Sequence, residues 1–286
     1  MKWSFGRVVQ YVRFFYFLSH RAEGIYSMLS RMYREPLLDK EKAADPRTLT
    51  CYGYSAFSQA DEDGMLQEIF NRIGATNRQF LEFGCGDGLE NNSTYLLFTG
   101  WSGVWLDGGE DNIRSVEQHF SDYLKSGQLK TRRAFITRDN INDLLREAQV
   151  PADLDMLSID IDGNDYWIWQ AMDSLRPRVV VVEYNATFRP PHKIVQKYNP
   201  THQWNSTNYF GASLSALAEL GDEKGYALVG CNFAGTNAFF VRRDLAGDLF
   251  SSPFTAEHHY RPPHYDAFVR GLSRHRRGAG PYEVLK

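Results

Sequence analysis

The stretch Phe80-Leu81-Glu82-Phe83-Gly84-Cys85-Gly86-Asp87-Gly88 is an apolar run that passes through an acidic residue and then breaks into glycines at every second position. Because glycine lacks a Cβ atom, the backbone at these positions can turn sharply and approach a bound ligand closely. In doubly wound α/β folds, a glycine-rich turn after the first strand holds an adenosine-containing cofactor. The stretch therefore predicts a first strand that ends at a cofactor site.

The glycine spacing differs from two common nucleotide-binding motifs. The pattern Glu-x-Gly-x-Gly-x-Gly is not the Gly-x-Gly-x-x-Gly dinucleotide fingerprint, and the Gly-Lys-Ser/Thr ending of a phosphate-binding P-loop is missing. The pattern resembles motif I of the Rossmann-like methyltransferases that use S-adenosylmethionine (AdoMet). This resemblance implies that Glu82, Gly84, Gly86 and Asp87 contact AdoMet.

Six further apolar runs follow at the spacing of alternating strands and helices. They predict strands over residues 102–107, 133–137, 154–159, 179–183, 225–229 and 237–241. The run at 179–183 is apolar almost throughout, as expected of a parallel strand buried on both faces. The last two strands are separated by a short connection, which predicts a closing hairpin. The expected fold is α/β: a Rossmann-like, doubly wound, seven-stranded sheet with the last strand antiparallel, plus a helical N-terminal extension.

Two more positions are expected at the cofactor. Asp107 ends the second predicted strand, 25 residues after Glu82. An acid at the tip of the second strand is placed to bind ribose hydroxyls. By analogy with the fold, Thr137 and Asn140, in the polar turn after the predicted third strand, should lie beside the adenine.

Composition limits the classes of partner and the compartment. A net charge of −3 gives no electrostatic reason to expect a nucleic-acid partner. The three cysteines, Cys51, Cys85 and Cys231, are odd in number and widely spaced, so they match neither a disulfide framework nor a zinc site. This usage favours a reducing, cytoplasmic location.

We divide the chain into an N-terminal extension (1–50), an AdoMet-binding domain (51–245) and a C-terminal extension (246–286). Residues 1–21 are rich in aromatic side chains but too interrupted by arginine to span a bilayer. A helical wheel gathers basic and apolar side chains on opposite sides: Lys2, Arg7, Arg13 and Arg21 against Phe5, Val8, Val12, Phe15 and Leu18. Such a helix serves either to pack on the domain or on a second subunit, giving a homo-oligomer, or to lie on a membrane surface.

The acidic segment Ser58–Gly64 precedes a stretch with helical apolar spacing. Its carboxylates suit the positive end of a helix dipole, which makes it a well-capped helix start. The alternative is that this polar loop closes over the AdoMet site.

The combined motifs resemble the FkbM-type methyltransferase group. The matching stretches lie at 54–64, 82–96, 100–104 and 157–166, and the most distinctive is Leu157-Ser158-Ile159-Asp160-Ile161-Asp162-Gly163-Asn164-Asp165-Tyr166. The resemblance covers about residues 52–245. It implies an AdoMet-dependent O-methyltransferase, and more closely it suggests bacterial members associated with surface-polysaccharide and glycan biosynthesis. The expected acceptor is a small molecule or glycan.

A sugar hydroxyl needs activation before it can attack a methyl group, by loss of its proton or by a cation. Asp160, Glu183 and Asn185 follow the fourth and fifth predicted strands, whose ends should meet in one crevice. Their oxygen atoms suit Mg²⁺, and Asp160 would also touch AdoMet. The arrangement is similar to catechol O-methyltransferase, except that Tyr184 separates Glu183 from Asn185. The alternative is that Asp160 and Asp162 cap the following helix.

His192 and His202 offer a second route to a base, because they fall in a long polar segment after the fifth strand where a lid would lie. An imidazole titrates near neutral pH and can accept a hydroxyl proton, although each could equally be an ordinary loop histidine. Two other classes stay open: a non-catalytic binding module with the same fold, and a nucleotide-dependent transferase, against which the missing phosphate-binding lysine counts. The basic tail Arg270–Arg277 is expected to be a solvated end.

Overall fold

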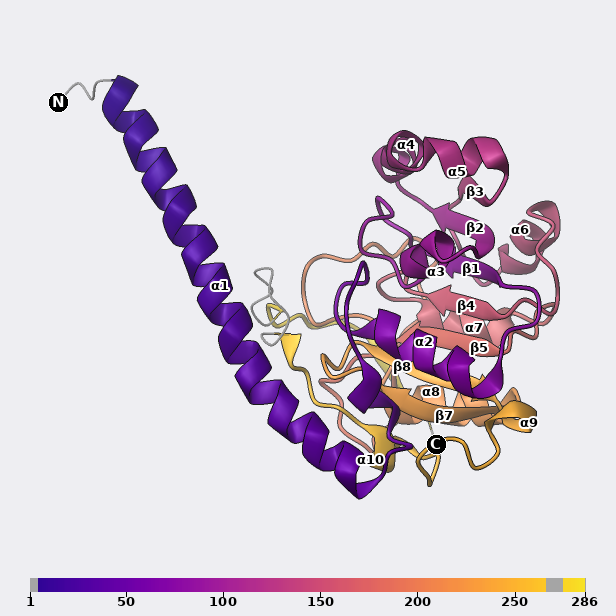
Figure 1. Cartoon of the computed structure of the whole chain (residues 1–286). Helices are drawn as coiled ribbons and strands as arrows, with labels where there is room; N and C mark the ends of the chain where they lie inside the picture. The colour runs from indigo at the N-terminus through magenta and orange to yellow at the C-terminus, as the bar shows by residue number, and fades with distance from the viewer. Residues whose placement is uncertain (1–4, 266–274, 286) are drawn as a thin grey trace.

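The computed structural model describes residues 5–265 and 275–285, with side chains except at positions 5–13, 15, 19, 20 and 23. The chain starts with α1 (Phe5–Ala44), a 3-10 turn η1 (Leu49–Tyr52) and α2 (Glu62–Ile73). Strands and helices then alternate (Figure 1): β1 (Gln79–Phe83), α3 (Thr94–Phe98), β2 (Ser102–Asp107), α4 (Glu110–His119), α5 (Ser121–Ser126), β3 (Leu129–Arg133), α6 (Ile141–Glu147), β4 (Met156–Ile159), α7 (Asp165–Ala171) and β5 (Val179–Glu183). The remaining elements are β6 (Ile194–Gln196), α8 (Leu214–Glu223), β7 (Tyr226–Cys231), β8 (Asn237–Arg242), α9 (Arg243–Ala246), α10 (Ala256–His259) and β9 (Tyr282–Val284).

Seven strands form one sheet in the order β3-β2-β1-β4-β5-β8-β7. The five strands from β3 to β5 are parallel, whereas β8 pairs antiparallel with both β5 and β7. Each parallel connection carries a helix, as the βαβ crossover requires. The predicted Rossmann-like, doubly wound sheet with an antiparallel last strand is confirmed.

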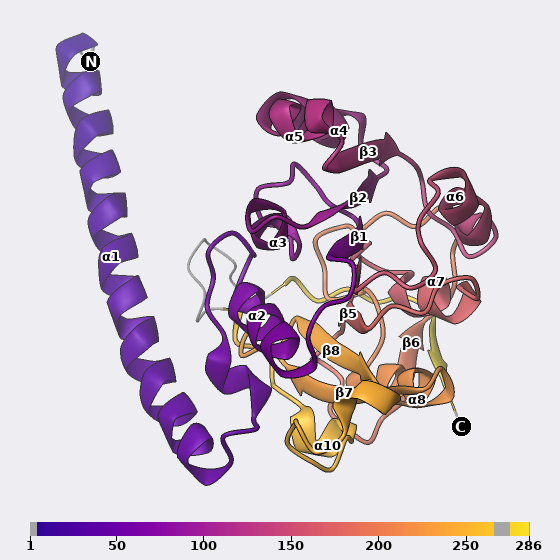
Figure 2. The ribbon, with the colours of Figure 1, turned by 45° about the vertical axis from the view of Figure 1, so that its right-hand side comes forward.

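Both faces of the sheet are buried under helices (Figure 2). Side chains of α2, α3 and α4 pack on one face, and those of α6, α7 and α8 on the other. The valines of β5 alternate between the two layers: Val179 and Val181 face α2, whereas Val180 and Val182 face α7 and α8. Each buried valine contributes roughly 1.5–3 kcal/mol, which explains the uninterrupted valine run in this strand.

The third strand lies four residues earlier than predicted. β3 covers Leu129–Arg133, and its register pairs Gly103 with Leu129 and Asp107 with Arg133. The prediction over 133–137 was wrong because it followed apolar residues, whereas β3 is an edge strand in which only Leu129 is buried. The apolar residues after β3 form a loop that reaches the carboxyl edge of the sheet.

The N-terminal helix α1 runs along the outside of the sheet domain, and Figures 1 and 2 show its N-terminal half extending away from it. Its C-terminal end is fastened by Glu41, which accepts two hydrogen bonds from the Arg261 guanidinium, one of them at 2.7 Å. Lys42 Nζ lies 4.1 Å from the centre of the Tyr52 ring. None of the helices among the described residues combines the length and the apolarity that crossing a bilayer requires.

Part of the predicted wheel lies outside the described side chains, namely Lys2, Arg7, Arg13, Phe5, Val8, Val12 and Phe15. For the described positions, Leu18 and Arg21 are both exposed.

The C-terminal extension returns to the domain. β9 pairs antiparallel with β6, and Asn208 N donates to the carbonyl of Arg276 (2.9 Å). The side chains of Arg276 and Arg277 are exposed, as expected of a solvated end, but their backbone is fastened to the loop before α8. Residues 270–274 of the predicted tail lie outside the described part of the chain.

Candidate functional site

A cavity of about 550 Å³ opens at the carboxyl edge of the sheet, beyond the ends of β1, β2, β4 and β5. Ligands of doubly wound folds bind at this edge. The turns after these strands supply most of its lining: Gly84, Gly86, Asp107, Gly108, Gly109, Asn112, Ala134, Phe135, Ile136, Asp160, Ile161, Asp162, Asn164 and Glu183. The rest of the lining comes from farther along or before the sheet: Gln59, His202, Gln203, Trp204, Phe210, Thr236, Tyr265 and His275.

The turn after β1 needs glycine for two different reasons. Gly84 has a φ of 72°, and a Cβ atom there would lie 1.6 Å from the carbonyl oxygen of Asp160. Only glycine lets the tips of β1 and β4 approach this closely. Gly86 also has a left-handed backbone, with a φ of 53°, but the space beside its Cα is open. Gly86 therefore leaves room for a ligand to lie against the backbone.

Asp107 ends β2, and the neighbouring turns hold its carboxylate in place. Its Oδ2 accepts a hydrogen bond from Gly86 N (2.9 Å), and its Oδ1 accepts from Gly109 N (2.7 Å) and Asn112 Nδ2 (3.0 Å). A carboxylate has about four acceptor positions, so this group can still accept a hydroxyl from a ligand in the cavity. The structure thus places Asp107 and both glycines where the sequence predicted them.

Two predicted cofactor residues lie outside the cavity lining. Glu82 is buried, and its carboxylate accepts hydrogen bonds from Asn92 N (2.9 Å), from Ser93 N (3.0 Å) and from the Ser93 hydroxyl. Glu82 therefore fixes the start of α3 rather than facing a ligand. Asp87 is exposed and accepts from Leu89 N (3.0 Å), which closes a local turn.

Thr137 and Asn140 also lie outside the lining. Asn140 Oδ1 accepts from Thr137 N (2.8 Å), and Thr137 Oγ1 accepts from Asn140 N (3.3 Å), so the two residues close the turn that precedes α6. Their predicted place is taken by Phe135 and its neighbours, because β3 ends earlier than the sequence indicated. Residues 134–136 form this part of the cavity lining and would contact an apolar group of a ligand.

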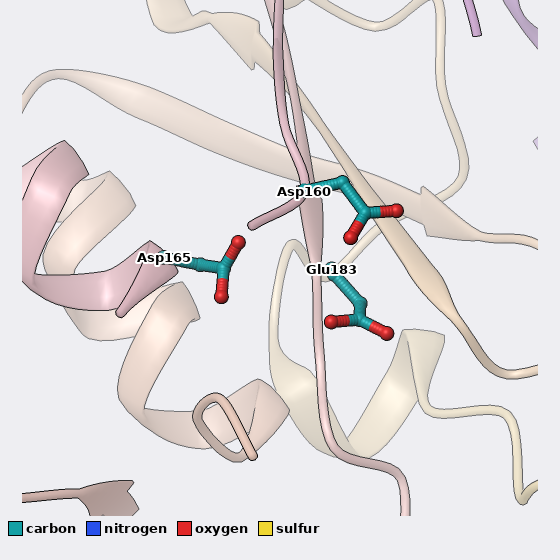
Figure 3. A group of neighbouring side chains, drawn as sticks. All are labelled: Asp160, Asp165 and Glu183. Carbon is teal, nitrogen blue, oxygen red and sulfur yellow. The ribbon is translucent and has the colours of Figure 1, made fainter. Parts of the chain in front are cut away.

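Three carboxylates converge at the ends of β4 and β5. Asp160 and Glu183 extend from the strand tips, and Figure 3 shows Asp165 reaching toward them from the start of α7. One oxygen from each group lies within 4.8 Å of the others. Asp165 accepts hydrogen bonds from Ile161 N (2.8 Å) and Gly163 N (2.9 Å). By contrast, Glu183 Oε2 is buried without a hydrogen-bond partner among the described residues.

Burial and mutual repulsion disfavour the charged forms of this cluster. Burial raises the pKa values of Asp160 and Glu183 well above their usual ranges; Asp162 and Asp165 raise that of Asp160 further, and Asp160 itself adds to that of Glu183. Burial raises the pKa of Asp165 to about 6, although its two backbone donors oppose the shift. The cluster is therefore suited to hold a proton or to bind a cation.

Asn185 does not belong to this cluster. It is fully buried, and its amide nitrogen donates to the carbonyls of Asn208 and Phe210, both at 2.9 Å. The side chain turns toward the loop before α8 because it supplies donors and an acceptor that this loop needs. Asp165 occupies the third position that the sequence had assigned to Asn185. The alternative role of Asp160 and Asp162 as helix caps is not observed either, since Asn164 is the N-cap residue of α7 and no side chain accepts a capping hydrogen bond there.

The two predicted histidines are separated. His202 lines the cavity, and its Nε2 lies 3.1 Å from the carbonyl oxygen of Asp162. Because a carbonyl only accepts, Nε2 carries the hydrogen and Nδ1 carries the lone pair of the neutral ring. Burial lowers the pKa of His202, which keeps the ring neutral near pH 7. His192 is exposed and does not line the cavity.

The acidic segment before α2 has a structural role that the dipole argument did not foresee. Asp63 Oδ2 accepts hydrogen bonds from the backbone N–H groups of Ala56 (2.7 Å), Phe57 (2.7 Å) and Ser58 (2.9 Å). Glu62 binds the side-chain amides of Asn232 (2.6 Å) and Asn237 (2.9 Å). These buried carboxylates fix the loop over residues 53–60, which carries Gln59 into the cavity wall.

A second cavity of about 920 Å³ lies between α1 and this loop. It shares three lining residues with the first cavity, Gln59, Thr236 and Tyr265. Its remaining lining includes hydroxyls, aromatic rings and charges of both signs: Ser27, Ser30, Arg31, Arg34, Glu35, Leu38, Gly53, Tyr54, Ser55, Ala56, Phe57, Ser58, Ala60, Leu89, Glu90 and Ala234. The two cavities therefore adjoin at the tip of the β7–β8 hairpin.

The chain matches no protein-family model, and no curated protein sequence matches it. Among solved structures, it is similar to the methyltransferase domain of bacterial CtHen1, with 13% identity, a TM-score of 0.40, and coverage of 63% of this chain and 97% of that one. It is also similar to the O-methyltransferase NcsB1 from neocarzinostatin biosynthesis, crystallised with AdoMet and 2-hydroxy-5-methyl naphthoic acid (16% identity, TM-score 0.35, 57% of this chain and 48% of that one). A third is an O-methyltransferase from Bacillus cereus in complex with S-adenosylhomocysteine (18% identity, TM-score 0.32, 53% of this chain and 66% of that one).

Several lining residues escaped the sequence analysis. Asp165 belongs to the carboxylate cluster rather than to the lining, and it had a usable signal, because it lies five residues after Asp160 at the start of a predicted helix. Tyr265 and His275 had none: they belong to the C-terminal extension and reach the site only because that segment folds back. His275 packs against Trp204 and Phe210, with ring centres 5.2 and 5.6 Å apart.

Proposed function

We propose that this protein is an AdoMet-dependent O-methyltransferase that acts on a hydroxyl of a sugar or glycoconjugate. The observation that carries the proposal is the arrangement of one cavity: the open backbone at Gly86 and the Asp107 carboxylate stand at one side, and the acidic cluster stands at the other. Backbone space and an acid at the second strand suit the ribose of an adenosyl cofactor. With the ribose there, the acidic cluster would lie toward the sulfonium end of the cofactor.

The adjoining cavities provide room for two ligands. A single small molecule or cofactor occupies a pocket of about 300–1,000 Å³, and each of the two cavities falls within this range. We assign the smaller cavity to AdoMet and the larger one to the acceptor. Hydroxyl and charged side chains beside the rings of Tyr54 and Phe57 suit a glycan, which needs both hydrogen bonds and flat apolar surfaces.

The acidic cluster fits a divalent cation such as Mg²⁺. Its ligand atoms are oxygens, and Glu183 Oε2 is a buried acceptor without a described partner. Mg²⁺ takes one or two carboxylates, waters and substrate oxygens, so Asp160 and Glu183 would hold it, with Asp165 beside them. When bound, the ion would lower the pKa of an acceptor hydroxyl.

His202 is the group best placed to receive the hydroxyl proton. Its neutral ring lines the cavity beside the turn that carries Asp162, and its hydrogen bond to the Asp162 carbonyl fixes the tautomer. Methyl transfer also needs the acceptor oxygen aligned with the sulfonium, so much of the rate depends on positioning. His192 is left out of the proposal because it is exposed away from the cavity.

Calorimetry with AdoMet, NAD and ATP tests the cofactor assignment. AdoMet should bind, and Asp107→Ala should weaken binding by about 1.5–3 kcal/mol, the scale of a hydrogen bond to a charged group. Asp111→Ala, which removes an exposed acid in the first turn of α4, is the matched control and should bind AdoMet normally. Preferential binding of NAD or ATP would indicate a different transferase, and unchanged AdoMet affinity in Asp107→Ala would contradict the assignment.

Transfer itself is tested by following S-adenosylhomocysteine formation with tritiated AdoMet and a panel of mono- and oligosaccharides. Label should appear in the sugar, and mass spectrometry should locate a methyl ether. Simple catechols serve as the comparison acceptors. AdoMet binding without transfer to any hydroxyl compound would favour a non-catalytic binding module.

A further inference from the structure

The helix α1 has two faces of different chemistry. One face contributes Ser27, Ser30 and Arg34 to the wall of the second cavity. The opposite face carries apolar side chains at a helical spacing, and we call Phe14, Leu18, Ile25, Leu29 and Met32 the outer stripe. Each side chain of the outer stripe is between 43% and 65% exposed. Met28 lies at its edge and is also exposed.

The outer stripe is too large to be an incidental apolar surface. Phe14 and Met32 are 18 residues apart, which at 1.5 Å per residue is about 27 Å. Soluble monomers rarely leave a contiguous apolar patch of this kind open unless it binds something. The aromatic ring of Phe17 extends it sideways, and the Arg21 guanidinium lies 5.2 Å from the Phe17 ring centre.

Charge distinguishes between the candidate occupants of this surface. Residues 1–34 contain six basic side chains and one acidic side chain, which gives this segment a net charge of +5. The whole chain has a net charge of −3, so the remaining residues carry a net charge of −8. A two-fold dimer through the outer stripe would bring like charges together, because the same surface serves both subunits. An anionic lipid surface would attract this basic segment and repel the rest of the chain.

We propose that the outer stripe of α1 docks on an anionic membrane surface. The helix lies in the interface with its apolar side chains among the lipids and with Arg21, beside the stripe, at the headgroups, as amphipathic helices of this composition do. Phe17, beside the stripe, is an aromatic side chain that suits that depth. The helix then separates the bilayer from the second cavity. This inference goes beyond the proposed methyl transfer and does not depend on it.

Vesicle sedimentation with the full chain tests the inference. The protein should pellet with vesicles of phosphatidylcholine and phosphatidylglycerol but at least about tenfold more weakly with phosphatidylcholine alone, because each basic residue near an anionic surface contributes. Ile25→Glu with Met32→Glu should abolish pelleting. Leu249→Glu with Val284→Glu adds the same charges at exposed apolar positions away from α1 and should pellet like the native chain. Arg21→Glu should weaken pelleting about fivefold or more.

AdoMet affinity of each variant, measured by calorimetry, reports whether the domain is folded and tests the methyltransferase proposal separately. Unchanged pelleting of the Ile25/Met32 variant, or equal pelleting on neutral and anionic vesicles, would overturn the membrane inference. Light scattering supplies the competing outcome: a native dimer that becomes a monomer in that variant, with no vesicle binding, would assign the outer stripe to a second copy. If the double glutamate variant loses AdoMet binding, the pelleting of Arg21→Glu alone tests whether the helix is attracted to anionic lipid.

Discussion

Two groups of carboxylates in this molecule look alike in the sequence and behave differently in the structure. The acids before α2 accept hydrogen bonds from backbone and amide donors, three of them on a single oxygen of Asp63. The acids beyond β4 and β5 face a cavity, and Glu183 Oε2 has no partner among the described residues. The first group is buried, and in the second Asp165 is buried whereas Asp160 and Glu183 are half-buried.

The two groups differ in what offsets the free-energy cost of burying a carboxylate. A buried carboxylate is tolerated where donors surround it, and it is expensive where they do not. In the first group, backbone and amide donors offset most of the cost, although Asp61 Oδ1 and Asp63 Oδ1 also lack described partners, and the group holds the loop over 53–60. The second group lacks full compensation, so a ligand, a cation or a proton must supply it. We infer that the first group stabilises the structure and that the second serves the reaction.

Asp160→Asn is the change with the largest expected effect. The amide nearly preserves shape but cannot balance a cation, so turnover should fall about 10²- to 10⁴-fold, the range for losing an acid–base or charge-stabilising group. AdoMet binding should persist, because Gly86 and Asp107 are untouched. The measurement is S-adenosylhomocysteine formation at saturating AdoMet, with calorimetry on the same variant.

Asp162→Asn is the matched control, since Asp162 lines the cavity but lies outside the cluster of three acids. It should lose much less activity. Full turnover of Asp160→Asn in excess EDTA would falsify the metal-assisted route and leave His202 as an unassisted base. Loss of AdoMet binding would instead assign Asp160 to the cofactor.

Asp63→Ala should mainly reduce stability. The change leaves three backbone N–H groups without their acceptor, which should lower the free energy of unfolding by about 3 kcal/mol. Urea denaturation measures this value. Asp143→Ala is the control: its carboxylate pairs with Arg146 on the surface and should change stability by less than about 1 kcal/mol. Equal losses in the two variants would mean that Asp63 does not fix the loop.

Asp61 is expected to give the smallest change in stability. It belongs to the first group but, like Glu183 of the second group, it has a carboxylate oxygen without a described partner. Burial, with the nearby Glu62 charge, raises the pKa of Asp61 to about 7. The unfolded value is about 3.9, so between these values the folded state binds more protons. Stability should therefore fall as the pH rises, by about 1.4 kcal/mol between pH 5 and pH 6 for this one group.

Asp61→Asn should remove this contribution to the pH dependence of the free energy of unfolding. The amide keeps an oxygen that can accept from Phe233 N, which donates at 3.1 Å. Urea unfolding at pH 5 and pH 6, on the native chain and the variant, compares the two slopes. Identical slopes would place the titrating group elsewhere.

Local patterns predicted the parts of the site that depend on strand ends. Gly84, Gly86 and Asp107 lie in the cavity because the carboxyl ends of parallel strands meet at one edge of the sheet. The same logic brought Asp160 and Glu183 together. The same reasoning failed for β3, because this exposed edge strand lacks an apolar signal. The sequence therefore assigned Thr137 and Asn140 to the adenine side of the cavity, where the structure has residues 134–136.

The sequence by itself determined the order of the strands, the glycine turn and the edge at which carboxylates gather, because these follow from local spacing and from the burial of apolar runs. Only the tertiary structure decided what each carboxylate does. Glu82 and Asn185 turn to donors and acceptors in neighbouring loops, and Asp165 turns to Asp160 and Glu183. The same holds for Tyr265 and His275, which reach the site from the end of the chain. Hydrogen-bond partners from distant segments decide whether a buried acid supports the fold or faces a ligand, and sequence spacing does not specify those partners.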